Sequence, residues 1–139
     1  MKIKKENNKE YLFDVVRKKY VINHPEEWVR QHIIHFLNKE KGYPISLMSV
    51  EKKTELNNMP KRCDIVCYNN KGEALLLIEC KSHNISLKNS AFYQSINYQN
   101  VIKAKYVIIT NGKTHYCFKI KNNKVIFEKK IPDYNDLNK

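Results

Sequence analysis

The chain has 139 residues, 42% of them hydrophobic and 11% aromatic, a composition that excludes wholesale disorder and favours a single domain over residues 1–139. It has no apolar run of about eighteen residues and no apolar signal-peptide core after Met1, so we expect a cytoplasmic protein without a transmembrane helix. The net charge of +12 attracts polyanions, of which nucleic acid is the commonest, although AT-rich coding also enriches a chain in lysine.

The first part of the chain is predicted to hold a strand and then a helix. Residues 11–22 are rich in β-branched and aromatic side chains and are expected to be extended. Pro25, followed by the acids Glu26 and Glu27, favours a helix N-terminus, and the helix is expected to end near residue 41. The expected core stripe of this helix has helical spacing and consists of Val29, Ile33, Phe36 and Leu37.

A hairpin is predicted at the centre of the chain, from residues 62–69 and 73–81. A second helix, over residues 91–103, separates the hairpin from the apolar run 106–110, and a crossover helix of this kind implies parallel pairing of the flanking strands. The other strands are expected at residues 45–56, 114–120 and 125–129. The order predicts an α/β fold with a central mixed β-sheet flanked by helices. The polar ends of the chain are expected to be loose, over residues 1–10 and 132–139.

Four cysteines lie in apolar or alternating segments, at Cys63, Cys67, Cys80 and Cys117. None of them forms a C-x-x-C pair, and the cytosol disfavours disulfides, so free thiols are expected. A structural zinc site is the alternative, and the cysteine spacing fits it poorly.

Charged residues cluster at one end of the predicted hairpin. Side chains alternate along a strand, so Glu79 and Lys81 face the same way and Cys80 faces the other way. Asp64 interrupts the apolar partner strand and meets them if the two strands pair in a suitable register. Two carboxylates can hold one Mg²⁺ through oxygen, with waters and a phosphate as further ligands. With a lysine beside them, this group suits metal-assisted phosphodiester hydrolysis.

Simpler interpretations of these residues stay open at this point. The end of the second hairpin strand could have left the core and be solvated, and Asp64 could form a salt bridge with Arg62 or a nearby lysine. Glu26 lies roughly 40° from the centre of the helix stripe and can lean over the sheet as a third acid, whereas Glu27 is expected to face water. Both acids could instead complement the helix dipole and pair with Arg30.

Gln94 and Tyr98 lie one turn apart on the second predicted helix. The glutamine amide could hold a phosphate or order a water, or the pair could be the polar shoulder of an amphipathic helix. Three glycines leave no room for a Walker A loop, and no HExxH, nucleophile elbow or zinc-finger spacing is present. His83 follows the charged cluster closely and is expected in a surface loop.

These segments, in this order, resemble the PD-(D/E)xK nuclease superfamily and, more narrowly, the N-terminal nuclease domain of type I restriction enzyme R subunits. The matching segments span nearly the whole chain and are FDVVRKKYV (13–21), PEEWVRQ (25–31), RCDIV (62–66), IECK (78–81), QSINY (94–98) and KYVIITNG (105–112). The resemblance implies a restriction-endonuclease-like core and the cleavage of DNA.

The resemblance also implies catalytic roles. Asp64 and Glu79 match the metal-binding acids, with Mg²⁺ as the expected cofactor and Mn²⁺ as a possible substitute. Lys81 matches the lysine that orients or activates water and stabilises charge on the phosphate. Glu26 matches the helix acid of such sites and is expected to be a further catalytic residue and metal ligand.

Contacts to nucleic acid are implied for Arg30, Gln94 and Tyr98, the last two matching the Q-x-x-x-Y motif of RecB-like nucleases. One departure is Cys63, which stands where the superfamily name has proline. Another departure is that the sequence shows no ATP-driven motor of the kind that R subunits carry. A restriction or repair partner, or DNA structure, is therefore expected to direct the chain to its target. A non-catalytic nucleic-acid-binding or scaffold protein that keeps the fold is the alternative, and cleavage of RNA or of DNA junctions is a third possibility.

Overall fold

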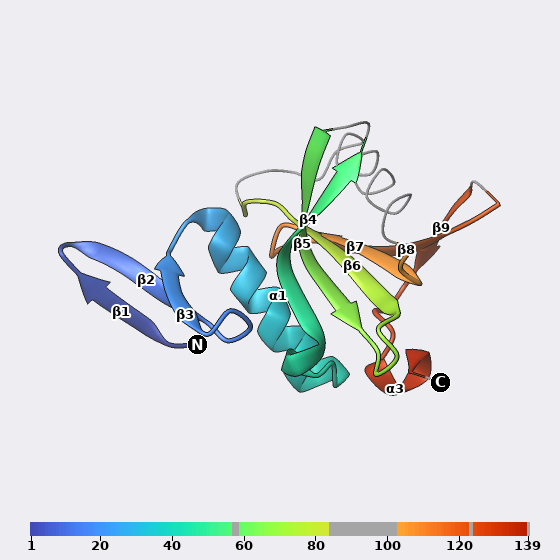
Figure 1. The fold of residues 1–139 in the computed structure, drawn as a ribbon, viewed down its shortest axis with the longest axis horizontal. Helices are drawn as coiled ribbons and strands as arrows, with labels where there is room; N and C mark the ends of the chain where they lie inside the picture. The colour runs from blue at the N-terminus through green and yellow to red at the C-terminus, as the bar shows by residue number, and fades with distance from the viewer. Residues whose placement is uncertain (57–58, 84–102, 123, 139) are drawn as a thin grey trace.

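The computed structural model describes residues 1–56, 59–83, 103–122 and 124–138, with the side chains of 52–63 left out of the description. Three strands form a small antiparallel sheet in the order β1-β2-β3: Ile3–Glu6, Lys9–Asp14 and Lys19–Ile22. This sheet lies beside α1 and away from the main sheet (Figure 1). No helix in these ranges is long and apolar enough to cross a bilayer.

The N-terminal sheet corrects two expectations. Residues 1–10 are not loose, because Asn7 and Asn8 adopt positive φ angles of 52° and 63° and turn β1 back onto β2. Residues 11–22 are not one strand, because the chain turns after Asp14 and Lys18 takes a φ of 56° before β3 begins. An Asn-Asn pair is a usable turn signal, since asparagine tolerates the left-handed region better than most residues.

Helix α1 spans Pro25–Lys41, as predicted, with Pro25 in its first turn. It ends where Gly42 enters the left-handed region at φ 78° and its backbone N–H donates to the Leu37 carbonyl. Three of the four predicted core residues are buried, but Phe36 is 37% exposed and Ile34 is buried in its place. The buried stripe is therefore rotated relative to the prediction, and this rotation also brings Glu27 inside.

The main sheet has six strands in the order β4-β5-β6-β7-β8-β9. They span Met48–Leu56, Met59–Tyr68, Ala74–Cys80, Tyr106–Thr110, His115–Lys121 and Lys124–Glu128, and a 3₁₀ turn at Ile45–Leu47 precedes β4. Only β6 and β7 pair in parallel, as the predicted crossover requires, so the sheet is mixed. The helix predicted over 91–103 lies almost entirely outside the described residues.

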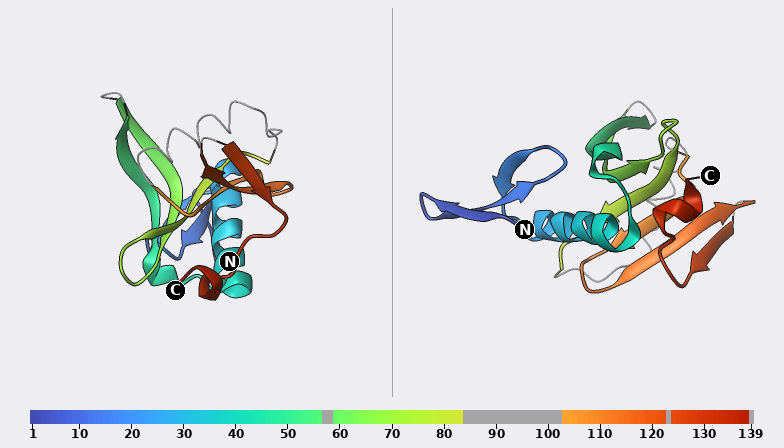
Figure 2. Two further views of the ribbon diagram at one scale, coloured as in Figure 1. Left: turned by 90° about the vertical axis from the view of Figure 1, so that its right-hand side faces the viewer. Right: turned by 90° about the horizontal axis from the view of Figure 1, so that it is seen from below.

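Alternation along the strands separates two hydrophobic clusters on the two faces of the main sheet. Ile65 and Ile78 join the cluster that includes α1, whereas Val66 and Leu77 belong to the other cluster. Helix α1 thus covers one face (Figures 1 and 2). The cysteines with described side chains are buried free thiols, as expected: Cys67, Cys80 and Cys117.

The C-terminal residues are ordered rather than loose. The short helix α3, Tyr134–Leu137, buries both of its end residues in the cluster that α1 covers. The hydroxyl of Tyr43 donates a 2.7 Å hydrogen bond to the carbonyl of Pro132, which fixes the approach to α3. The sequence signal for this helix is the pair of apolar residues Tyr134 and Leu137 within a polar segment, and the prediction did not use it.

Candidate active site

The acids predicted from the hairpin meet where β5 and β6 diverge. The two strands pair through Ile65 and Ile78, so the next residues outward are Asp64 and Glu79. Both are buried, at 9% and 5% exposure. The Asp64 carboxylate accepts a 2.7 Å hydrogen bond at Oδ2 from the backbone N–H of Cys80, which fixes it across the two strands.

Lys81 lies beside Glu79, as alternation predicted. Its Nζ is 3.3 Å from Glu79 Oε1, while Cys80 packs into the cluster on the opposite face. The backbone N–H of Lys81 donates a 2.8 Å hydrogen bond to the carbonyl of Thr110, which continues the β6–β7 contact past the last paired residue. The sheet thus positions this lysine through its main chain.

Glu79 has a carboxylate oxygen that could hold a cation. Its Oε2 is buried and has no hydrogen-bond partner in the part of the chain that the structure describes. Burial, together with the charge of Asp64, raises the pKa of Glu79 to about 8, against the opposing effect of Lys81. A buried carboxylate oxygen beside a second carboxylate fits a divalent cation with oxygen ligands.

Arg30 enters this group from α1. Its Nη2 donates to Asp64 Oδ1 at 3.0 Å, and its Nη1 donates to Glu27 in a short ion pair. Burial lowers the pKa of Arg30, but the charges of Glu27 and Asp64 outweigh it and hold the pKa above its ordinary value. The sequence had predicted a contact between Arg30 and nucleic acid. At 5% exposure its guanidinium faces carboxylates instead, and a DNA contact stays a prediction.

The first-turn acids of α1 differ from the prediction: Glu27 is buried, and Glu26 is the more exposed of the two. Glu27 is 7% exposed and paired, whereas the Glu26 side chain is half exposed and lies 3.7 Å from Arg30. Burial and the charge of Asp64 raise the pKa of Glu26, against Arg30 and Lys81, so Glu26 lies within electrostatic reach of the hairpin cluster. Glu26 can therefore join the site from its rim.

A second layer of charges behind Arg30 was missed from the sequence. Glu27 also accepts from Arg17 Nη2 at 3.0 Å and from Gln31 Nε2 at 2.9 Å. Arg17 in turn forms a short ion pair with the fully buried Asp14. The signal available was the spacing of Glu27, Arg30 and Gln31, which places them as neighbours along one side of a helix.

Four predicted residues thus converge: Asp64, Glu79 and Lys81, with Glu26 at the rim. Gln94 and Tyr98 lie outside the described residues. Within the described ranges, no group of three or more His, Cys, Asp or Glu side chains is placed to hold a metal ion, so Glu26 does not complete such a group with Asp64 and Glu79. Two acids are still enough for Mg²⁺, which commonly takes one or two carboxylates and completes its shell with water and phosphate.

The fold and these residues define a class: an α/β protein with a mixed six-stranded sheet and buried acids beside a lysine at the end of a central hairpin. The sequence profile of the type I restriction enzyme R protein N terminus (HSDR_N) matches residues 25–132. The chain therefore belongs to this family. No curated protein matches it significantly in sequence.

Two solved structures share the fold. A fragment of a proposed HsdR subunit of a type I restriction enzyme from Vibrio vulnificus YJ016 aligns with a TM-score of 0.60 and 16% identity over 81% of this chain. The chain spans 24% of that protein. A proposed DUF820 nuclease from Anabaena variabilis ATCC 29413 aligns with a TM-score of 0.52 and 9% identity, over 96% of this chain and 86% of that one. Both support the predicted restriction-endonuclease-like fold.

Proposed function

We propose that this chain is a metal-dependent DNA endonuclease domain that hydrolyses phosphodiesters. The observation that carries the proposal is the meeting of Asp64, Glu79 and Lys81 at the end of the β5–β6 hairpin, with one buried carboxylate oxygen of Glu79 left without a partner in the described ranges. Structural ion pairs normally satisfy their buried oxygens, whereas a site built for a cation keeps one available.

In this proposal each residue of the site has its own role. Asp64 and Glu79 would hold Mg²⁺, with Mn²⁺ as a substitute, and a bound metal would supply positive charge at the scissile phosphate. Lys81 would neutralise charge that develops on the phosphate oxygens, in a position fixed by its backbone bond to Thr110. Arg30 would orient Asp64 through its guanidinium and is a positioning residue.

The proposed substrate follows from charge. A net charge of +12 gives salt-sensitive affinity for a polyanionic backbone, with no need for sequence readout. A restriction or repair partner that directs the chain to its target is also part of the proposal, because the chain belongs to the family of type I restriction enzyme R protein N termini.

Incubation with supercoiled plasmid, linear duplex and single-stranded DNA tests the proposal, with Mg²⁺, with Mn²⁺ and with chelator. We expect cleavage of at least one substrate that depends on the metal. Asp64→Asn and Lys81→Met should abolish it while DNA binding survives, and Lys124→Met, an exposed lysine on β9, should cut normally. Unchanged cleavage in both site variants would refute the proposal.

A second function, binding without catalysis, is favoured by one observation. Both oxygens of Asp64 already have partners, namely Arg30 and the Cys80 amide. A site closed in this way would serve structure alone. Calorimetric titration with Mn²⁺ at low salt separates the two functions: DNA binding without any metal binding would favour the scaffold.

A further inference from the structure

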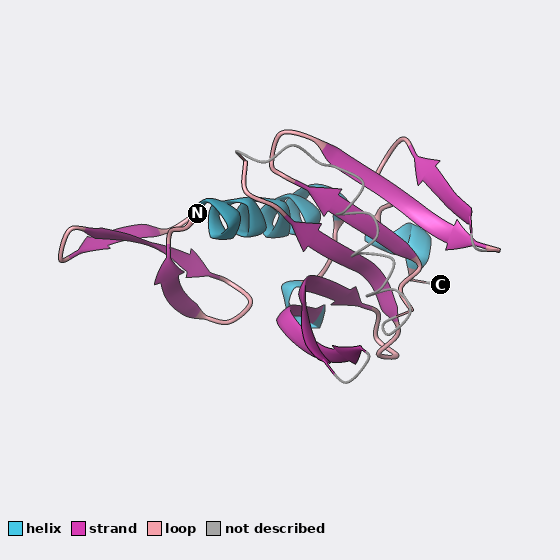
Figure 3. Cartoon of the chain, turned by 90° about the horizontal axis from the view of Figure 1, so that it is seen from above, coloured by secondary structure: helices cyan, strands magenta, loops and turns pink. Residues whose placement is uncertain are grey.

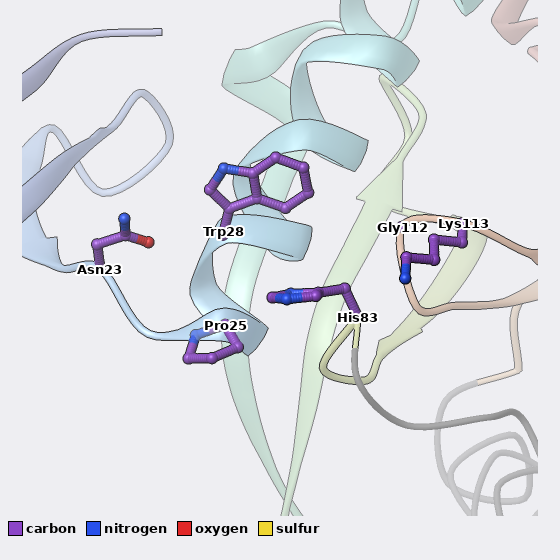
Figure 4. A pocket seen from close by; sticks show the side chains of 6 residues that line it. All are labelled: Asn23, Pro25, Trp28, His83, Gly112 and Lys113. Carbon is purple, nitrogen blue, oxygen red and sulfur yellow. The ribbon is translucent and has the colours of Figure 1, made fainter.

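An open cavity of about 340 Å³ adjoins the candidate active site. Its lining comes from the start of α1, the segment after β6 and the loop after β7: Asn23, Pro25, Trp28, His83, Gly112 and Lys113 (Figure 4). Pro25 directly precedes Glu26, and His83 lies two residues after Lys81. A ligand in this cavity would therefore lie near the end of β6, the strand that carries Glu79.

Trp28 gives the cavity a fixed aromatic wall. Its ring stacks on His32, with 3.6 Å between centroids and 32° between planes, and His83 approaches at 6.1 Å and 63°. Trp28 is nevertheless 38% exposed, so part of the residue is open to solvent and to a further group. A large aromatic side chain that is held in place yet open to solvent is a suitable platform for a nucleobase.

Polar groups at the cavity fit a nucleotide. Nδ1 of His83 is buried at the cavity wall and has no hydrogen-bond partner among residues with described placement. Lys113 is exposed at the cavity wall and can meet a phosphate. Past Gly112, a second cavity of about 220 Å³ continues along α1 beside His32 and Phe36.

We propose that the cavity beside Trp28 binds an unpaired nucleobase of a DNA strand, stacked on the indole, with the strand's backbone passing Lys113 toward Lys81. This inference rests on the proposed nuclease function and specifies its substrate class. The faces of a base in a duplex are covered by its neighbours, so only an unpaired nucleotide can offer a free face to Trp28. The preferred substrate is then single-stranded DNA or DNA with an unpaired segment.

Trp28 is the single tryptophan of the chain, so its fluorescence reports directly on the cavity. The titration uses the full chain in chelator with three probes: a single-stranded oligothymidylate, the same backbone with abasic sites, and a blunt duplex. We expect quenching by the base-bearing single strand and about tenfold weaker binding of the abasic strand, which is the loss that one base stack predicts. Equal affinity for the two strands, or unchanged fluorescence, would overturn the inference.

Variants measured by anisotropy of a labelled oligothymidylate give the second test. Trp28→Leu should weaken binding about tenfold, and Trp28→Phe should restore most of it because a ring remains. Phe127→Ala removes an aromatic residue that is 58% exposed on β9 and should change nothing. If Trp28→Leu, shown to be folded by circular dichroism, binds like the wild type, a partner other than a nucleobase occupies the cavity and the inference fails.

The two proposals can fail separately. A metal-dependent nuclease that binds base-bearing and abasic strands equally refutes the cavity's role alone. Base-dependent quenching by a chain that cuts no substrate refutes catalysis alone, because the titration contains no divalent metal.

Discussion

Arg30 is the residue on which the site's electrostatics depend. It is buried between Glu27 and Asp64 and bonded to both, and Glu27 has Arg17 as a second cationic partner. A divalent cation that used Asp64 Oδ1 would have to share that oxygen with Arg30. If the site binds a metal as proposed, that metal would compete with the contact that stabilises Asp64 in the metal-free protein.

Arg30→Met should be strongly destabilising. The variant leaves the buried Asp64 without its cation and removes one of the two arginine partners of Glu27, which keeps Arg17. Loss of one partner of a buried ion pair typically costs about 3–5 kcal/mol. Urea denaturation followed by circular dichroism measures the free energy of unfolding. Glu26→Gln is the matched control, because this side chain is half exposed and lies 3.7 Å from the same arginine. The interpretation fails if the two variants unfold at the same urea concentration.

Glu79 should make metal binding depend on pH. Its pKa of about 8 lies above the ordinary value of 4.5, so below pH 8 the folded protein holds a proton that a metal must displace. Mn²⁺ affinity in calorimetric titrations should therefore rise with pH, by up to about tenfold per unit, and level off above pH 8.

The raised pKa of Glu79 has the opposite effect on the stability of the metal-free protein, which falls where metal affinity rises. Between pH 4.5 and about 8 the unfolded chain releases the Glu79 proton while the folded chain keeps it, so stability falls as pH rises through that window. Glu79→Gln should flatten both profiles. Mn²⁺ affinity with the same pH dependence in this variant would assign the proton to another group.

At the scale of elements, the contact between α1 and the β7–β8 loop supports both the site and the cavity. Gly112 adopts φ +87° in this loop, and a Cβ there would lie 3.3 Å from Val29 Cγ2 and 3.7 Å from Trp28. Glycine thus serves two needs at one position, a left-handed backbone and a close approach to the helix.

Comparing Gly112→Ala with Gly72→Ala separates the cost of the left-handed backbone from the cost of the close approach to α1. Both glycines have φ near +80°, but a Cβ at Gly72 has nothing within 4 Å. Gly72→Ala should cost about 1–2 kcal/mol for the left-handed backbone alone. Gly112→Ala should cost more, by about 1 kcal/mol or above, because Val29 must move. Thermal unfolding of both variants measures the difference, and equal losses would mean that the loop relaxes freely.

Predictability from the sequence also varies by element. Helix α1 and the β5–β6 hairpin were predictable because Pro25, Gly42 and the apolar strands are local signals. The direction of Glu27 was not, since it depends on Arg17 arriving from the β2–β3 turn, a contact that no helical periodicity contains. Likewise Phe36 fits the apolar stripe by spacing, yet it is 37% exposed and stacks near the ring of His115 on β8.

At the scale of the whole molecule, the N-terminal sheet extends the fold beyond the family match. The profile begins at residue 25, whereas β1–β3 end at Ile22. The small sheet lies at the N-terminal end of α1, away from the main sheet (Figure 3). Its link to the site is the buried pair of Asp14 and Arg17, which reaches Glu27 and through it Arg30. A residue outside the family match, Arg17, thus also supports the candidate site.

The salt dependence of DNA binding should distinguish phosphate contacts from base stacking. Each phosphate contacted in a single strand contributes about 0.7 to the slope of log affinity against log salt. Lys113→Met should weaken oligothymidylate binding and lower the slope by about one contact's share, whereas Trp28→Leu should weaken binding at every salt concentration and leave the slope unchanged. Anisotropy titrations between about 50 and 200 mM KCl measure both. Lys124→Met on β9 is the control for a general loss of charge. If it lowers the slope as much as Lys113→Met, the affinity comes from the overall field of the protein, and the strand has no fixed path beside the cavity.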